Sequence, residues 1–235
     1  MADDPHIGRI IRRNWRVVRK IGGGGMGTVF EVRHERTHHL RRALKQIKTG
    51  LEQNSELARR FRREMNVMAQ LEGADHIVRV HDFDEEEGFG TFVLMDLIDG
   101  PSLADMIRQH RGRGLPYKDV LYFGRQIATA LQLVHDRGIV HRDIKATNVL
   151  VDLKTRKAYL TDFGIAKELA AAEGDEMGDD ATSVGIASQY IGTARYSPPE
   201  QLRVEYPPKP IWDIYSLGAV LYLSLIHISE PTRRS

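Results

Sequence analysis

The sequence predicts an α+β fold in which a β-rich first part is followed by a mainly helical second part. Apolar and polar residues alternate over 15–18 and 28–32, which is the period of a half-buried strand. Residues 103–109 and 117–136 instead repeat apolar residues every three or four positions, as amphipathic helices do. Strand character stops at Gly100-Pro101. We therefore expect a boundary between two lobes at this point.

A glycine run, Ile21 to Gly27, separates the first two predicted strands. Glycine has no Cβ, so the backbone of such a hairpin can approach a ligand closely. The pattern alone also fits a flexible linker, and a dinucleotide-binding fingerprint would open a helix rather than a second strand. Because Val29 follows two residues after Gly27 and Ala43-Leu44-Lys45 lies on the next predicted strand, we favour a loop that covers phosphates.

A helix is predicted over 55–71, where Leu57, Phe61, Met65 and Met68 recur at helical steps. Glu64 lies beside this apolar stripe. It is either a surface residue of a charged helix or the partner of a lysine elsewhere, and spacing alone does not decide between these interpretations.

The composition excludes several classes of site. No cysteine is present, so disulfides and thiolate metal sites are excluded and a reducing compartment fits. The formal net charge is only +2, and the basic residues of the first segment are scattered through predicted strands without a nucleic-acid recognition motif. We therefore expect no nucleic-acid partner. His34, His38 and His39 fall in a predicted turn without a carboxylate or thiol at ligand spacing, so a solvated turn is favoured over a metal site.

The beginning of the sequence is polar and acidic, which does not fit a signal peptide. The longest apolar run, 217–228, is too short to span a bilayer and predicts a buried helix. A segment after Gly164 has no periodicity, and 168–180 contains six acidic residues and no basic one. A loop of this length is usually functional or disordered.

The chemistry concentrates in a short polar loop between two apolar runs, His141 to Asn148. Asp143 is followed by Lys145 two residues later and by Asn148 five residues later, and Asp162-Phe163-Gly164 comes twelve residues past Leu150. The loops thus offer a proton acceptor, a cation and two oxygen ligands for a metal. This inventory suits phosphoryl transfer, where positioning and charge neutralisation supply most of the catalysis.

The order His-Arg-Asp, Asn, Asp-Phe-Gly resembles the catalytic and magnesium-binding loops of protein kinases, and the likeness covers roughly Trp15 to Tyr222. Residues 24–27, 61–64 and 138–140 are similar to those of bacterial serine/threonine kinases. The resemblance implies a bilobal protein-kinase-like fold, with one regulatory helix in a β-rich N-lobe and a mainly helical C-lobe. The implied domains are an N-terminal extension (1–14), the N-lobe (15–98), a truncated C-lobe (99–222) and a non-native tail (223–235).

The resemblance also implies the roles of individual residues. Asp143 would accept the proton of the substrate hydroxyl, Lys145 would contact the γ-phosphate, and Asn148 and Asp162 would hold Mg²⁺, or Mn²⁺ in its place. Thr193 indicates the serine/threonine branch. Lys45, paired with Glu64, would hold the ATP phosphates. The residues expected to contact or support ATP are Ile21, Gly22, Gly24, Gly27, Val29, Ala43, Lys45, Glu64, Asp96, Ile98 and Leu150.

Regulation by phosphorylation is a further expectation, because Arg142 lies beside the catalytic acid and an arginine can order a phosphorylated loop. Ser188 is the favoured site, with Thr182 and Ser183 as further candidates, and an unmodified Ser188 is the alternative. Dimerisation for autophosphorylation of this loop and protein substrates with serine or threonine are the partners that the resemblance implies. We expect a cytoplasmic location for this portion, and many bacterial relatives carry a membrane helix beyond the kinase.

Two departures from the family pattern stand out. Pro198-Pro199-Glu200 replaces the usual Ala-Pro-Glu, and few residues follow the predicted apolar helix 212–222. Residues 223–233 resemble the in-frame translation of a sequencing adapter. We therefore expect a truncated C-lobe whose last helix partly faces water, and hence an unstable or inactive fragment. A pseudokinase and a small-molecule phosphotransferase are the rival interpretations. All catalytic residues are present, which disfavours the first, and 193–200 has the form of a peptide-binding segment, which disfavours the second.

Overall fold

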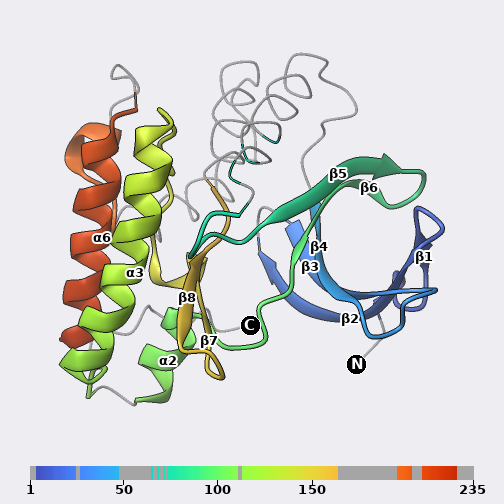
Figure 1. The fold of residues 1–235 in the computed structure, drawn as a ribbon, viewed down its shortest axis with the longest axis horizontal. Coiled ribbons are helices and arrows are strands. Elements are labelled where there is room, and N and C mark those ends of the chain that lie inside the picture. The colour runs from blue at the N-terminus through green and yellow to red at the C-terminus, as the bar shows by residue number, and fades with distance from the viewer. Residues whose placement is uncertain are drawn as a thin grey trace, which may run out of the picture. The chain divides into compact units, whose positions relative to one another are not determined.

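The computed structural model describes residues 4–24, 27–47, 65, 68, 71, 73–110, 113–163, 195–202 and 208–226. The chain forms two compact units, and each is described by itself. Of the described residues, the first unit holds those up to 73 and 78–98, and the second holds 74–77 and those from 99 onward. The predicted α+β class is confirmed, because the first unit is built on a sheet and the second mainly on helices (Figure 1).

The first unit is an antiparallel sheet with the strand order β1-β2-β3-β4-β6-β5. Figure 1 shows that this sheet is strongly curved. Its strands are β1 (Ile10–Ile11), β2 (Trp15–Gly24), β3 (Gly27–His34), β4 (Arg41–Ile47), β5 (Val80–Glu86) and β6 (Gly90–Asp96).

Strand register separates the two faces of this sheet. Phe30, Leu44 and Leu94 are cross-strand partners, and they belong to the buried core on one face. Val29, Lys45 and Val93 are also partners, one residue along each strand. Because successive side chains of a strand point to opposite faces, Val29 and Lys45 lie on the face opposite that core.

A short strand before Trp15, β1, belongs to the same sheet, which the sequence did not predict. Ile10–Ile11 pairs with β2, and Ile11 is fully buried in the core of this unit. The Arg9 guanidinium donates to the Gly88 carbonyl at 2.7 Å, in the turn between β5 and β6. The N-terminal segment therefore ties the strand β2 to the far hairpin of the same sheet.

The second unit contains helices α2 (Leu103–Gln109), α3 (Tyr117–Asp136) and α6 (Pro210–Leu225), and the hairpin of β7 (Val149–Asp152) and β8 (Lys157–Leu160). A capping box of Ser102 and Asp105 begins α2. Helices α3 and α6 lie side by side (Figure 1), and they approach closely at Gly124, where a Cβ would lie 2.7 Å from a Leu221 methyl carbon.

The predictions of α2 and α3 are confirmed, whereas α6 is longer at both ends than the predicted 212–222. Most of the predicted helix 55–71 lies outside the described residues, although Met65 and Met68 are helical and buried. The long acidic segment, 168–180, also lies outside them. No helix within the described ranges is long and apolar enough to cross a membrane.

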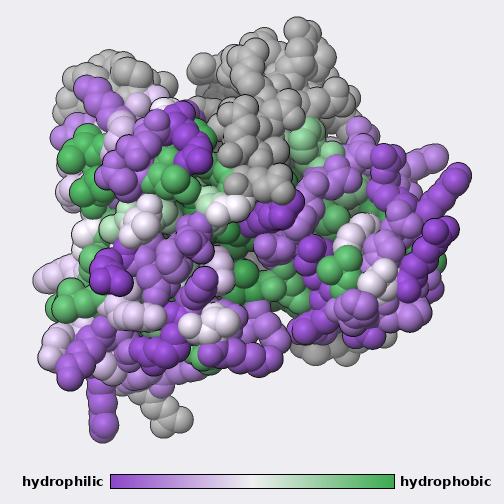
Figure 2. Space-filling model, viewed as in Figure 1, coloured by the Kyte–Doolittle hydropathy of each residue, from purple (hydrophilic) through white to green (hydrophobic). Residues whose placement is uncertain are grey.

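Helix α6 exposes an apolar stripe, as the sequence predicts. The exposed side chains of α6 include Ile211, Ile214, Tyr215, Tyr222 and Leu225, which recur at helical spacing. Hydrophobic side chains reach the surface over α3 and α6 in Figure 2, at the left of the view. Such a surface favours self-association, because apolar area in contact with water forgoes about 25 cal/mol per Å².

We therefore expect the double variant Ile214→Lys/Tyr222→Lys to self-associate less than the unchanged chain. Sedimentation velocity over a range of concentrations measures this. Leu217→Lys, at a position only 7 % exposed on the same helix, is the control and should destabilise the fold. The prediction is contradicted if the unchanged chain stays monomeric over the same range of concentrations as the double variant.

Candidate active site

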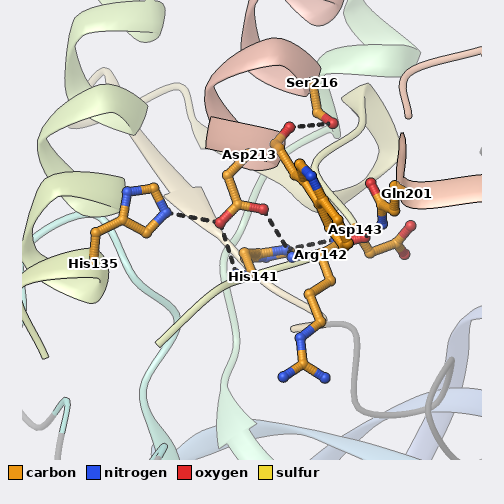
Figure 3. Close-up of polar contacts among 8 residues, drawn as sticks. His135, His141, Arg142, Asp143, Gln201, Asp213 and Ser216 are labelled. Atoms are coloured by element: carbon orange, nitrogen blue, oxygen red, sulfur yellow. Dashed lines mark hydrogen bonds and ion pairs between the residues drawn. The ribbon is translucent and has the colours of Figure 1, made fainter. Parts of the chain in front are cut away.

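The polar loop 141–148 is held by Asp213, a buried acid of α6 (Figure 3). The backbone N–H of His141 donates to Asp213 Oδ2 and that of Arg142 to Oδ1, each at 2.8 Å. Arg142 has a φ of 67°, in the left-handed region that side chains with a Cβ rarely adopt. The two hydrogen bonds stabilise this strained turn, while the Arg142 side chain points away from Asp213 (Figure 3).

A third donor completes the surroundings of the Asp213 carboxylate. His135, in the last turn of α3, places Nε2 at 2.8 Å from Asp213 Oδ2. Two helices thus meet the loop at one buried carboxylate. The role of Asp213 was not predicted from the sequence, although an isolated acid in an otherwise apolar helix is a signal for it.

His141 is fully buried, and burial lowers the pKa of its imidazole below the ordinary value. Its Nδ1 accepts from the backbone N–H of Asp143 at 3.3 Å, so Nε2 carries the proton and donates to the Thr161 carbonyl at 3.1 Å. The ring also lies against Phe163, with centroids 4.3 Å apart. A neutral histidine therefore links the polar loop to the segment 161–163.

Asp143 presents a carboxylate with two neighbours on one oxygen. Asn148 Nδ2 donates to Oδ2 at 2.9 Å, and Lys145 Nζ lies 2.8 Å from the same atom. Asn148 Nδ2 also donates to the Asp143 carbonyl at 2.9 Å, across the 3₁₀ turn Ala146–Asn148. The predicted acid, lysine and asparagine are thus brought together in one loop.

Asn148 and Asp162 offer oxygen ligands for a divalent cation. Because the amide nitrogen of Asn148 is committed to Asp143, its Oδ1 is the atom left for a metal. The Thr161 N–H donates to the Asn148 carbonyl at 3.0 Å, which brings the residue before Asp162 to the end of the loop. Amide and carboxylate oxygens are the ligands that Mg²⁺ prefers, so this donor set fits the ion. Within the described residues, no cluster of three or more His, Cys, Asp or Glu side chains forms another candidate site.

Three of the residues assigned to ATP in the first unit share the sheet face opposite its core. Val29 and Lys45 are cross-strand partners, and Ala43 lies two residues from Lys45 on β4, so the three share that face. Ile21 is 37 % exposed on β2, and Asp96 ends β6 with Ile98 two residues later. Leu150, on β7, belongs to the second unit.

The glycines predicted to form a loop over phosphates lie partly in β-strands. Strand β2 continues through Gly22 and Gly24 and pairs with the start of β3. Gly27 is required by packing, because a Cβ there would lie 2.1 Å from the Gln46 carbonyl oxygen of the neighbouring strand. Access for a ligand is therefore not the sole reason for this glycine.

Five predicted residues lie outside the described ranges: Glu64, Thr182, Ser183, Ser188 and Thr193. Two further sets of contacts were not predicted from the sequence. Gln201 Nε2 donates to the Arg142 carbonyl at 2.7 Å. Glu31, almost fully buried, is paired with Arg41 at 2.8 Å and Arg19 at 2.7 Å. The hydrogen bond from Arg41 is the largest cause that lowers the pKa of Glu31.

Comparisons with known proteins agree with this arrangement. The protein kinase domain family matches residues 15–233. The serine/threonine-protein kinase PknA of Mycobacterium tuberculosis is 35% identical over 222 residues, which cover 93% of this chain and 48% of PknA. A protein of Clostridium perfringens, named as a probable serine/threonine-protein kinase, is 32% identical over 216 residues, which cover 92% of this chain and 29% of that protein. The chain thus spans less than half the length of these curated relatives.

The fold is also shared with solved structures. A crystal structure of the Mycobacterium tuberculosis PknI kinase domain matches with a TM-score of 0.71 and 26% identity, over 97% of this chain and 82% of that chain. The chain belongs to the protein kinase family. The predicted kinase fold and the likeness to bacterial serine/threonine kinases are therefore confirmed. Use of ATP with a divalent metal, and action on proteins, are general properties of this family.

Proposed function

We propose that the protein of which this chain is part is a serine/threonine protein kinase that transfers the γ-phosphate of ATP to hydroxyl groups of protein substrates. The contacts of Asp143 carry the proposal. Its carboxylate is aligned by Asn148 and faces the ammonium group of Lys145 at 2.8 Å. A proton acceptor beside a cation is what transfer to a neutral hydroxyl requires, since the proton leaves as negative charge develops on the phosphate.

Each residue of the loop has a distinct role in this proposal. The substrate oxygen bonds to the γ-phosphorus, the bond between that phosphorus and the β–γ bridging oxygen breaks, and ADP leaves. Asp143 accepts the hydroxyl proton, and Lys145 offsets charge on the transferred group. Asn148 and Asp162 would hold Mg²⁺, or Mn²⁺ in its place. The ion would neutralise phosphate charge when bound.

We assign ATP binding to the sheet face that carries Val29, Ala43 and Lys45, with the backbone of 96–98 recognising the adenine. In the same proposal, Glu64 pairs with Lys45, and Thr193 helps to position the substrate. Phosphorylation of Ser188 regulates the enzyme, with Thr182 and Ser183 as further candidates, through autophosphorylation between two copies. The cytoplasm, which supplies ATP, is the proposed location of this portion.

A Lys45→Ala variant tests the proposal against a binding-only role. We expect the full-length protein to transfer labelled phosphate from ATP to a basic protein, with Mg²⁺ or Mn²⁺ but not with EDTA. Lys45→Ala should lose most transfer because the phosphates are no longer positioned. Lys20→Ala, which removes an exposed lysine of β2, is the matched control. Nucleotide binding by the folded full-length protein without metal-dependent transfer would favour the pseudokinase interpretation instead.

A further inference from the structure

Asp96, the last residue of β6, is contacted by side chains from both neighbouring strands. Its Oδ1 lies 2.6 Å from His81 Nε2 on β5 and 3.5 Å from Arg42 Nη1 on β4. The side chains of Asp96, His81 and Arg42 are 37%, 19% and 25% exposed, so all three are partly withdrawn from water. We call these three residues the Asp96 cluster. None of their side chains has a role in the chemistry derived above.

The strands are arranged so that both partners reach this one carboxylate. Arg42 and Asp96 are cross-strand partners in the antiparallel pair of β4 and β6. On the other side, the register between β5 and β6 shifts between Val80 and Asp82, so His81 is the extra residue of a β-bulge. A bulge re-aims a side chain, and here it allows the His81 ring to reach Asp96. The backbone N–H of Asp96 is also bound, to the Arg79 carbonyl at 2.9 Å.

The position of the cluster connects it to nucleotide binding. Asp96 and Arg42 lie one residue along from Met95 and Ala43, which are partners on the nucleotide-facing side. The Asp96 and Arg42 side chains therefore occupy the opposite side of the sheet. The backbone that continues from Asp96 to Ile98 is the segment assigned to the adenine ring. The cluster thus holds this segment from behind, at the point where β6 and its ladder of hydrogen bonds end.

We propose that His81 and Arg42 are positioning residues for ATP, because they fix Asp96 and so set where the backbone of 96–98 presents its hydrogen-bonding groups to adenine. This inference rests on the proposed function. Neither side chain need touch the nucleotide. A hydrogen-bonded, partly desolvated carboxylate has few accessible positions. The backbone donors and acceptors that follow Asp96 are therefore already oriented for adenine before the nucleotide binds.

A merely stabilising role predicts different behaviour. Partly exposed ion pairs contribute little to the free energy of unfolding, so loss of one pair should move the melting temperature only slightly. A displaced backbone group, by contrast, loses a directed hydrogen bond to the ligand. The positioning role therefore appears in ATP binding and leaves the thermal midpoint and the KM for the protein substrate nearly unchanged.

The test measures KM and kcat for ATP, the dissociation constant of ATP by calorimetry and the thermal midpoint, in the same preparations. His81→Ala and Arg42→Ala should each raise the KM and the dissociation constant for ATP roughly three- to tenfold, the effect of one net hydrogen bond, with a smaller change in kcat. His81→Gln should restore much of the affinity, because its Nε2 can donate from nearly the same place. Arg16→Gln is the matched control, since it breaks the Arg16–Glu35 pair at 2.7 Å on the same sheet without touching β6.

The outcomes separate this inference from the function on which it rests. A full-length protein that is folded but neither binds ATP nor transfers phosphate overturns the proposed function, and the positioning role with it. An active chain whose His81→Ala and Arg42→Ala variants keep the ATP affinity of the original overturns the positioning role alone. The positioning role is also overturned if Arg16→Gln weakens ATP binding as much as they do, or if His81→Gln restores nothing while the thermal midpoints agree.

Discussion

Asp143→Asn is expected to lower the rate of phosphate transfer about 10²- to 10⁴-fold, the range that a positioned acid–base group contributes. The affinity for ATP should change little, because in the proposed reaction Asp143 acts on the substrate hydroxyl. The asparagine side chain keeps nearly the same volume and retains an oxygen that can accept from Asn148, so the loop geometry should persist. Initial rates with a protein substrate and calorimetric titration with ATP measure the two quantities separately.

Asp136→Asn is the control for Asp143→Asn, since Asp136 is an exposed acid at the end of α3 that contacts Gln132. It should leave both the rate and the affinity unchanged. A rate for Asp143→Asn within about threefold of the original would remove Asp143 from the role of proton acceptor, because acid–base catalysis contributes far more than that. A parallel loss of ATP affinity would instead place Asp143 at the nucleotide.

Local sequence patterns predict the elements whose boundaries are chemically marked. Helix α2 begins at the Ser102 capping box, and α3 is closed by Gly138, whose φ is 73°. Neither boundary depends on distant residues, and both predictions agree with the structure. Strand β8, Lys157–Leu160, was not predicted, because four residues with one charge do not show a clear alternation. Strand β1 is only two residues long and is defined by its pairing with β2, so no periodicity could reveal it.

In the candidate site, too, local contacts could be predicted from the sequence and distant contacts could not. Asp143, Lys145 and Asn148 lie within six residues, and their contacts with one another follow from a single short loop. The contacts that hold this loop come from far along the chain. Asp213 is 72 residues from His141, and Gln201 is 59 residues from Arg142. Such pairings depend on how helices pack, and a local pattern carries no information on them.

Electrostatics explains why these distant contacts matter. The turn at Arg142 is strained, and the neutral form of His141 depends on its burial. The strained turn requires a fixed acceptor for its backbone N–H groups, and Asp213 is 1% exposed where it provides one. A carboxylate at this depth is costly unless it is fully hydrogen-bonded, which its three donors achieve. The loop and the buried acid therefore stabilise each other.

Asp213→Asn is accordingly expected to have the largest effect on stability. An amide offers only one oxygen, so its NH₂ group must face at least one of the donors from His135, His141 or Arg142. The variant loses one charge-assisted hydrogen bond and leaves one buried donor unsatisfied. Together these two effects should lower the free energy of unfolding by about 2–4 kcal/mol. Phosphate transfer should fall with it, because the strained turn before Asp143 loses its support. Urea unfolding followed by fluorescence, together with transfer rates below the transition, measures both effects.

Asp119→Asn is the control for Asp213→Asn. It breaks the exposed pair with Arg156 and should lower the free energy of unfolding by less than about 1 kcal/mol. Equal losses of stability in the two variants would show that the buried carboxylate does not support the loop.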